Sequence, residues 1–442
     1  MASNNYHTYQ DMQQGLTVKS ESLFTLTPER PVAMDGIIQR LEQQTLIEGT
    51  LSYHVESEDA LTLQLMTGED QYHYRITLNH RYPLEHLQYT SRACEIDSSV
   101  QAEASRERQR VKVSSVWSED PFLCWHMQLR VLAVVVPDML LGQDTSAGNK
   151  LFTRQWLAFQ TQTFANPALS IFYTLDAIDF DSWYWVHTHG MGRLGLPEIE
   201  INVPRSHDGL EWAEGCIDTF IDISLGDGHV LFHEAIPLAA NSQHEEYLIA
   251  LPWEQGEAFA DSSKHLDEVR KLPELEEIIS RPSAAQLEER GEAHTGPSCW
   301  LFHLAGQRGR LENCYAPDFD TKHPHFYRSI ARTQREAVTA RLRWPYFQAL
   351  FEGTARNNIW LFMVKAAIPY DGGSKRENMW FIADAIDADS LLGELISEPV
   401  HVQGMQNGQR YRLELEQVVS WTINTDKAKI TVDNIYQLIT FS

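Results

Sequence analysis

Residues 183–201 constrain the fold more than any other stretch, because they combine aromatic, imidazole and carboxylate side chains in a strand-like alternation. Side chains two residues apart lie on the same face of a β-strand. The first half therefore places four side chains on one face: Trp183, Trp185, His187 and His189. In the second half Glu198 and Glu200 share a face, and the Gly-rich connection between the halves allows a tight turn.

Two imidazoles on one strand face could bind a divalent metal ion, with Glu198 or Glu200 as an oxygen ligand or a general base. An HxH pair lacks the spacing of a zinc finger or of the HExxH helix. The same residues therefore also fit a structural role, with the imidazoles hydrogen-bonded around a turn and the tryptophans in the core. The candidate metal ligands are His187, His189, Glu198 and Glu200, and the candidate binding surface is Trp183, Trp185 and Arg193. A second possible ligand set lies in a Pro-containing loop: Asp318, Asp320, His323 and His325.

Charge and cysteine content narrow the choice of partners and of compartment. The chain has 36 Lys and Arg against 61 Asp and Glu, a formal net charge of −25, which disfavours binding to nucleic acid or to anionic lipid. A protein partner with a basic surface fits this charge better. The five cysteines contain no CxxC pair and are expected to be reduced. Because the N-terminus has no signal-peptide pattern and no apolar run could span a bilayer, we expect a cytoplasmic protein.

The 442 residues are enough for about two to four domains. Residues 1–25 are polar and aperiodic and predict a loose arm that can contain one edge strand. Residues 26–254 mix helical and strand periods and predict an α/β region of one or two subdomains. Residues 255–325 predict an acidic helical connector with a loop, and residues 326–442 predict a small β-rich, barrel-like domain. The predicted fold class is therefore α+β.

Individual elements have local signals. Asp120-Pro121 combines a capping carboxylate with Pro at the first helical position, and predicts a helix that ends before Pro137. Leucines around Leu63 and tyrosines around Tyr74 alternate on either side of Gly68 and predict a hairpin. Further helices are predicted over residues 35–44, 149–164 and 329–343, and strands over 171–177, 359–366, 379–385, 391–396 and 411–415.

The motif residues resemble an uncharacterised bacterial family. His187-Thr188-His189-Gly190 and Gly195-Leu196-Pro197-Glu198-Ile199-Glu200 are similar to that family's signature, HTHG followed by GLPELE, and the likeness spans residues 20–290. The run Asn378-Met379-Trp380-Phe381-Ile382 is similar to a YegJ-like domain, with Asn378 where many such domains carry His. A fainter likeness is to Suppressor-of-fused-like domains, which in bacteria are often regarded as toxin-immunity proteins. These resemblances imply two fused domains and no established activity.

Three functions are compatible with these observations. The first is a non-catalytic protein-binding, immunity or accessory factor without a cofactor. The second is a metal-dependent hydrolase that uses His187, His189, Glu198 and Glu200. The third is a small-ligand sensor whose C-terminal domain binds the ligand. The sequence contains neither a Gly-x-Ser-x-Gly elbow nor a phosphate-binding glycine loop, and it does not set the oligomeric state.

Overall fold

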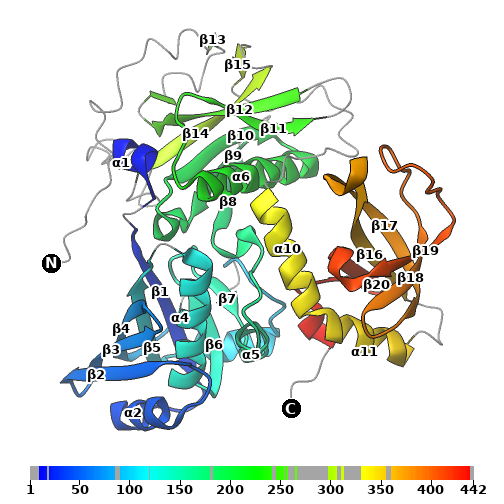
Figure 1. The fold of residues 1–442 in the computed structure, drawn as a ribbon. Coiled ribbons are helices and arrows are strands. Elements are labelled where there is room, and N and C mark those ends of the chain that lie inside the picture. The colour runs from blue at the N-terminus through cyan, green and yellow to red at the C-terminus, as the bar shows by residue number, and fades with distance from the viewer. Residues whose placement is uncertain are drawn as a thin grey trace. The chain divides into compact units, whose positions relative to one another are not determined.

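The computed structural model describes residues 9–16, 19–84, 90–118, 120–179, 183–240, 245–253, 255–256, 264–265, 297–305, 310–312, 330–354 and 360–438. The chain divides into two compact units, drawn in Figure 1. Unit 1 comprises Met1–Arg154 and Leu169–Ser329, and unit 2 comprises Gln155–Ala168 and Ile330–Ser442. Helices and three mostly antiparallel sheets together confirm the predicted α+β class.

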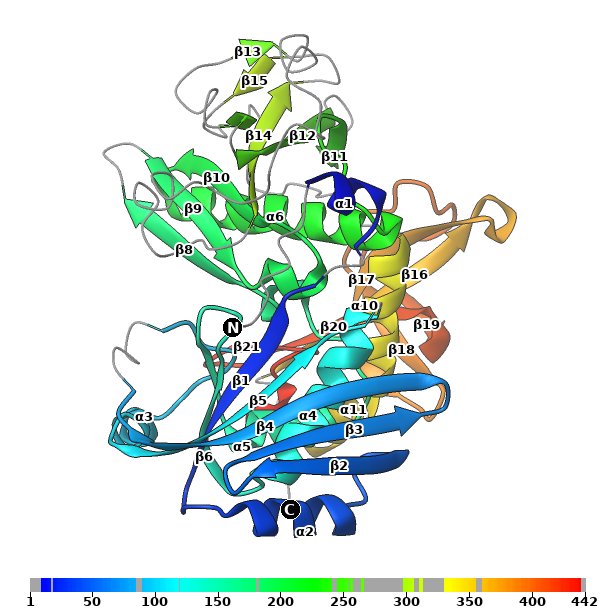
Figure 2. The ribbon, with the colours of Figure 1, turned by 90° about the vertical axis from the view of Figure 1, so that its left-hand side faces the viewer.

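The first sheet of unit 1, sheet A, is antiparallel throughout and contains seven strands among the described residues. In sheet order these are β2 (Thr50–Ser57), β3 (Ala60–Thr67), β4 (Asp70–Tyr82), β5 (Arg108–Val116), β1 (Glu21–Pro28), β6 (Met139–Asp144) and β7 (Lys150–Phe152). The β3–β4 hairpin confirms the alternation around Leu63 and Tyr74, whose side chains are both buried. Figure 2 shows β2 at the outer edge of this sheet.

The N-terminal segment is part of the core, so the prediction of a loose arm over residues 1–25 is corrected for its described part. The helix α1 (Tyr9–Gln14) buries Tyr9 and Met12, and β1 lies between β5 and β6. Ser22, Thr25 and Thr27 of β1 are as buried as its apolar residues. Both faces of β1 are covered, so its small polar side chains are buried together with its apolar ones. In the sequence these polar residues gave a central strand the pattern of an exposed segment.

Helices α2 (Met34–Gln43), α3 (Ser98–Ala104) and α4 (Pro121–Val135) also belong to this part of unit 1. The α4 prediction is confirmed: the Asp120 carboxylate accepts the backbone N–H groups of Phe122 and Leu123. In the middle of α4, the Gln128 side chain accepts from Trp117 Nε1 and donates to the carbonyls of Ser22 and Val113. These buried bonds tie α4 to β1 and β5.

The second sheet of unit 1, sheet B, has eight strands among the described residues. Its main path is β11 (Ala235–Ala240), β12 (Glu245–Pro252), β14 (Ser298–Ala305), β10 (Glu198–Pro204), β9 (Trp183–His189) and β8 (Thr174–Asp179). Off this path, β15 (Arg310–Glu312) pairs with β14, and β13 (Lys264–His265) pairs with β15. The helix α6 (His207–Asp227) contacts β10, and two short 3₁₀ helices are η2 (Leu169–Ile171) and η3 (Met191–Leu194).

The prediction of a connector over residues 255–325 is wrong for residues 298–305. These form β14, which pairs with β10 in parallel and with β12 antiparallel, inside sheet B. Six of the eight residues of β14 are hydrophobic, but no local signal shows that the strand returns to a sheet begun more than a hundred residues earlier. Residues 266–296 and 313–329, with Asp318, Asp320, His323 and His325, lie outside the described residues.

Unit 2 is an open six-stranded antiparallel sheet with helices. The strands, in sheet order, are β19 (Arg410–Glu414), β18 (Ser390–Leu395), β17 (Lys375–Ile386), β16 (Leu361–Tyr370), β20 (Val418–Asn424) and β21 (Lys429–Thr431). The end strands β19 and β21 do not pair with each other, so the expected barrel is corrected to an open sheet in the described residues. Short 3₁₀ helices complete the unit: η7 (Asp371–Gly373), η8 (Leu415–Gln417) and η9 (Ile435–Leu438).

Among its described residues, unit 2 contains three α-helices: α5 (Arg154–Thr161), which belongs to this unit from Gln155 on, α10 (Ile330–Leu342) and α11 (Trp344–Thr354). The Trp421 indole donates to the Ala340 carbonyl, and Phe347 of α11 packs on Trp421 at 5.1 Å between ring centroids. Pro345 ends α10 as predicted but also stands at the start of α11, a position that suits its fixed φ. The predicted helix over residues 149–164 is shorter than expected, since residues 150–152 form β7.

Candidate functional site

Cross-strand pairing brings three titratable residues side by side on sheet B. His187 of β9 lies opposite Asp176 of β8 on one side and opposite Glu200 of β10 on the other. Residues directly opposite each other project to the same face of a sheet. His189 follows His187 by two residues and joins them, as the sequence alternation predicts. We call Asp176, His187, His189 and Glu200 the histidine face.

The imidazoles on this face are close together and partly fixed by their neighbours. His189 Nε2 lies 3.1 Å from Asp176 Oδ2, and the His187 and His189 ring centroids are 5.1 Å apart at an interplanar angle of 83°. The Trp185 ring packs on His187 at 4.9 Å. Ligand atoms of Asp176, His187 and His189 all lie within 4.8 Å of one another, the spacing of a possible metal site.

Asp176 and His189 perturb each other's protonation. The hydrogen bond with His189 holds the pKa of the Asp176 carboxyl below its usual range. Burial opposes protonation of His189, but its hydrogen bond to Asp176 and the charges of Glu198 and Asp176 outweigh burial and raise the pKa of the imidazole. The Asp176–His189 pair therefore stabilises positive charge at this position of sheet B.

Glu198 holds the turn between β9 and β10. Its Oε1 accepts the backbone N–H groups of Gly190 and Met191 at 2.9 and 3.0 Å, and its Oε2 accepts the Thr188 hydroxyl at 2.7 Å. Gly190 has a φ of 122°, and a Cβ there would lie 2.4 Å from the Phe172 carbonyl oxygen. This turn therefore requires glycine, which explains the HTHG part of the motif.

Glu200 is fully buried beside His187, and its Oε1 accepts the Ser298 hydroxyl at 2.9 Å. Among the described residues, the group with metal-ligand spacing contains His187 and His189 but neither Glu198 nor Glu200. Its carboxylate is Asp176, which sequence reasoning missed. The available signal was the short gap between the strands at 174–179 and 183–189, which makes them a hairpin and places Asp176 opposite His187.

The candidate binding surface of Trp183, Trp185 and Arg193 is not supported as one surface. Trp183 and Trp185 are half-buried, and Trp185 packs against a core cluster that includes Trp300 and Phe302. Arg193 is fully buried, so its prediction as a surface residue is wrong. A charged residue in a Gly-rich connection is expected to be exposed, but Arg193 forms an ion pair with a buried carboxylate.

That partner is Asp144 of β6. The Arg193 guanidinium contacts both Asp144 carboxylate oxygens, at 2.9 and 2.8 Å, and donates to the Phe172 carbonyl at 2.8 Å. The Trp117 ring lies 4.9 Å from the guanidinium carbon. This bidentate, stacked arrangement is one that arginine makes and lysine cannot. It connects sheet A with the turn that follows the histidine face.

Lys150 of β7 is a second buried cation near Asp144. It is 6% exposed, and its Nζ donates to the carbonyls of Ser170, at 2.5 Å, and Tyr173. Burial lowers the pKa of Lys150 from 10.5 to about 8, an effect that Asp144 opposes and Arg193 reinforces. The Lys150 side chain therefore loses its proton at mildly alkaline pH.

Lys150→Met is expected to change how stability depends on pH. The folded state loses the Lys150 proton near pH 8 and the unfolded state near 10.5, so the unfolded state binds more protons between these values. The free energy of unfolding of the wild type should therefore rise relative to the variant, by up to about 3 kcal/mol, as pH increases through this range. Urea unfolding at several pH values measures the difference. Lys375→Met, at an exposed lysine, should show no such trend, and parallel curves for wild type and Lys150→Met would contradict the expectation.

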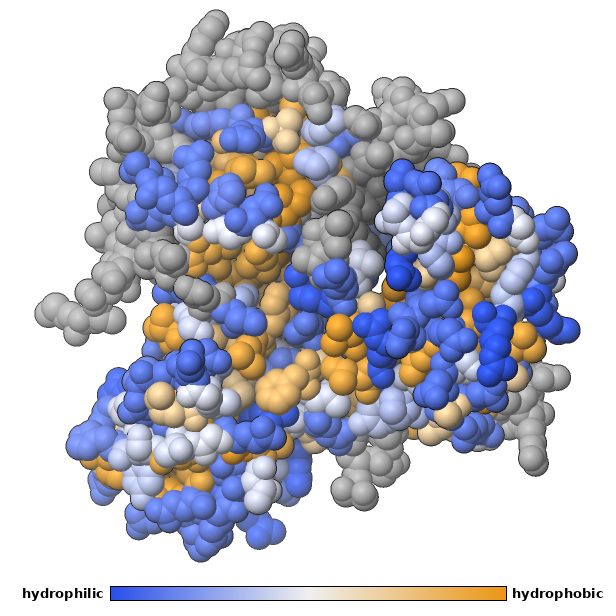
Figure 3. Space-filling model, in the orientation of Figure 1, coloured by the Kyte–Doolittle hydropathy of each residue, from blue (hydrophilic) through white to orange (hydrophobic). Residues whose placement is uncertain are grey.

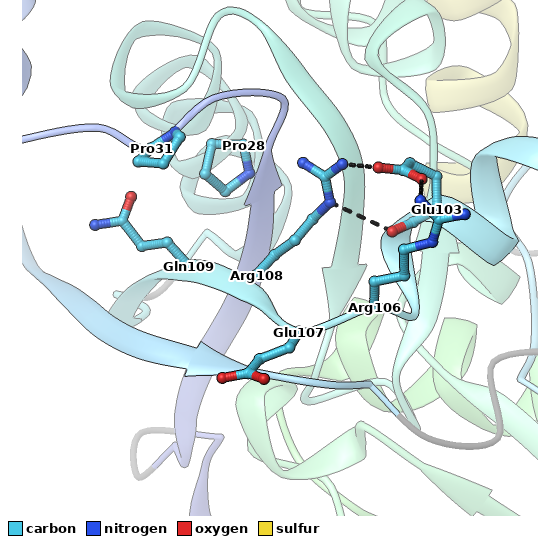
Figure 4. A pocket seen from close by; sticks show the side chains of 7 residues that line it. All are labelled: Pro28, Pro31, Glu103, Arg106, Glu107, Arg108 and Gln109. Atoms are coloured by element: carbon cyan, nitrogen blue, oxygen red, sulfur yellow. Dashed lines mark hydrogen bonds and ion pairs between the residues drawn. The ribbon is translucent and has the colours of Figure 1, made fainter.

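A shallow pocket of about 220 Å³ lies elsewhere on unit 1 and is drawn in Figure 4. Arg106 and Arg108 both pair with Glu103, and Arg108 also donates to the Glu29 carbonyl. The arginines are thus already engaged, and the pocket offers little for recognising an anion. Its lining residues are Pro28, Pro31, Glu103, Arg106, Glu107, Arg108 and Gln109.

The described cysteines carry no sign of nucleophilic chemistry. Cys94, Cys124, Cys216 and Cys299 are buried and form no disulfide with one another, as expected for reduced thiols, and Cys314 lies outside the described residues. Burial raises the pKa of the Cys216 and Cys299 thiols, which keeps them protonated. Among the described helices, none has the length and apolar character needed to cross a bilayer.

Family models match three consecutive parts of the chain. Residues 22–167 match the N-terminal part of a protein of unknown function, DUF4026, and residues 173–302, which contain the histidine face, match its C-terminal part. Residues 332–437 match an uncharacterised protein conserved in bacteria, DUF2314, while the likeness to YegJ-like domains stays a prediction. Neither a curated protein nor a solved structure matches the chain. The chain thus carries the N- and C-terminal domains of DUF4026 followed by a DUF2314 domain.

Proposed function

We propose that this chain is a cytoplasmic, non-catalytic protein-binding factor, and that it captures an extended basic segment of its partner along strand β2. The observation that carries the proposal is the exposed apolar face of this edge strand. An edge strand can accept a partner strand through its unpaired backbone groups, with side-chain pockets setting specificity.

The apolar face of sheet A continues onto β2 and is only partly covered there, where the Tyr53 hydroxyl donates to Glu42 of α2 at 2.7 Å. Leu61, Leu63 and Leu65 of β3 are fully buried. Their cross-strand partners on β2 are Val55, Tyr53 and Leu51. Tyr53 is 40% exposed and Val55 is 45% exposed. An added strand with apolar residues at alternate positions would extend this face and cover both side chains.

The other edge of β2 has no strand neighbour among the described residues. Natural proteins usually protect such edges with lysine, proline, a bulge or a short strand. Residues 50–57 contain neither lysine nor proline, although a register irregularity lies near their end, between Val55 and Ser57. Eight residues are enough for a partner strand to pair along its length.

Charge around β2 favours a basic segment. Glu42, Glu48, Glu56 and Glu58 are all exposed, and Arg75 of β4 pairs with Glu56 at 3.0 Å. Figure 3 shows small hydrophobic patches among hydrophilic residues on this part of unit 1. Together with the net charge of −25, this predicts that electrostatic attraction speeds encounter with a basic partner.

Synthetic eight-residue peptides that alternate valine or threonine with lysine test the proposal directly. Binding is measured by fluorescence anisotropy, and backbone protection of residues 50–57 by hydrogen exchange. The lysine peptide should bind and protect these amides, whereas the same peptide with glutamate in place of lysine should bind at least about tenfold more weakly. Association should slow as salt increases, while dissociation changes less.

Val55→Lys should abolish peptide binding, because a lysine on the exposed apolar face gives β2 the protection that edge strands normally have. Val116→Lys is the matched control, since Val116 is 61% exposed but lies at the end of β5, an interior strand. Equal binding by the two variants, or equal binding of lysine and glutamate peptides, would disprove docking on β2.

A further inference from the structure

We propose that Asp176, His187 and His189 form a binding site for a divalent transition-metal ion, with Zn²⁺ as the ion that their chemistry fits best. Two imidazoles and one carboxylate are a ligand set of zinc sites with an open coordination position, and a related set binds non-haem iron. The site is independent of docking on β2.

The ligands come from two adjacent antiparallel strands, β8 and β9. Asp176 and His187 are direct cross-strand partners, and Thr174 pairs with His189 on the same two strands. All three side chains therefore project from positions that backbone hydrogen bonds fix. Sites built on strands hold their ligands more accurately than sites built on loops.

The distances need little adjustment to hold an ion. Zinc bonds to imidazole nitrogen and carboxylate oxygen are about 2.0–2.2 Å long, which puts tetrahedral ligands about 3.4 Å apart. His189 Nε2 and Asp176 Oδ2 are 3.1 Å apart, and the ligand atoms of all three residues lie within 4.8 Å. Closing the larger separations to a ligand spacing is within the reach of small side-chain rotations.

The surroundings of the site also favour a cation. Glu200, fully buried, is the cross-strand partner of His187. Carboxylates outside the first ligand sphere commonly orient metal-binding imidazoles and increase their basicity. Trp185 packs against His187 and restricts its ring.

The ligands differ in exposure in a way that permits entry of an ion. His187 is 4% exposed, whereas the Asp176 side chain is 58% exposed and that of His189 is 20% exposed. An ion can therefore approach from the Asp176 side and reach the buried imidazole. Three protein ligands leave at least one coordination position for water or a ligand oxygen.

The competing explanation is that Asp176 and His189 form only an ion pair. Zn²⁺ titration of the metal-free full chain by calorimetry, with elemental analysis after gel filtration, separates the two. The site predicts one Zn²⁺ per chain, no comparable binding of Mg²⁺, and visible absorption from a low-coordinate complex when Co²⁺ replaces Zn²⁺. Absence of stoichiometric Zn²⁺ would overturn the proposal.

Variants locate the ion. His189→Ala and Asp176→Asn should each weaken Zn²⁺ binding at least about tenfold and remove the Co²⁺ absorption, and both residues are exposed enough to keep the fold. Asp179→Asn, on the same strand, and His229→Ala, at a partly exposed histidine outside the histidine face, should bind as the wild type does. Unchanged Zn²⁺ stoichiometry and absorption in both ligand variants would place the ion elsewhere and refute this site. Peptide binding at β2 should be unaffected in all four variants. The metal site and docking on β2 are therefore tested independently.

Discussion

Replacing Arg193 with Met is expected to destabilise unit 1 by about 3–5 kcal/mol, because the buried Asp144 carboxylate loses the guanidinium that contacts both of its oxygens. The Arg193 and Asp144 side chains are 0% and 6% exposed, and the guanidinium contacts both carboxylate oxygens. Methionine fills part of the space between Trp117 and Phe172 but supplies no donor. Urea unfolding followed by tryptophan fluorescence and circular dichroism measures the loss.

Arg205→Met is the matched control for that variant. Arg205 pairs with Asp179 at 2.6 Å, but their side chains are 49% and 52% exposed. An exposed ion pair contributes only about 0–1 kcal/mol, so this variant should be close to the wild type. If Arg193→Met and Arg205→Met lower the free energy of unfolding equally, Arg193 does not hold unit 1 together.

Arg343→Met is expected to destabilise unit 2 by about 2–4 kcal/mol, because several buried acceptors lose a charged donor. Arg343 is 1% exposed and donates to Gln160 Oε1 at 2.8 Å and to the Val432 carbonyl at 3.0 Å. Its guanidinium also lies 4.5 Å from the Phe159 ring centroid. The measurement is the midpoint and free energy of the unfolding transition of unit 2 in urea.

The same variant tests whether residues 155–168 are an integral part of unit 2. Gln160→Ala removes one Arg343 acceptor and should cost less than Arg343→Met but more than Arg412→Met, whose ion pair with Asp387 is about two-thirds exposed. If neither Gln160→Ala nor Arg343→Met changes the free energy of unfolding of unit 2, residues 155–168 are only a linker.

Local signals accounted for the elements that the sequence predicted well. The cap of α4 depends on Asp120 and the two residues whose N–H groups it accepts. The shared face of Trp185, His187 and His189 follows from the period of a strand. The β3–β4 hairpin needs only alternation and a turn. Each of these features is contained within a few neighbouring residues.

Prediction from the sequence failed for residues whose contact partner lies far along the chain. Arg193 was predicted to be exposed because its partner, Asp144, lies 49 residues away. The helix α5 was assigned to the first region because Arg343, the partner of Gln160, lies 183 residues further along the chain. The place of Asp176 in the candidate site required the hairpin register as well as the HTHG motif.

The sequence by itself determined the charge, the α+β class, the capped and alternating elements and the two imidazoles on one strand face, because these depend on composition and short-range geometry. Only the tertiary structure decided that β1 and β14 are interior strands, that Arg193 is buried and that Asp176 joins the imidazoles. Sheet order is set by which apolar faces and hydrogen-bonding edges meet after collapse, as when the Tyr9 hydroxyl bonds the Ser298 carbonyl across 289 residues of chain. No local pattern of residues carries that information.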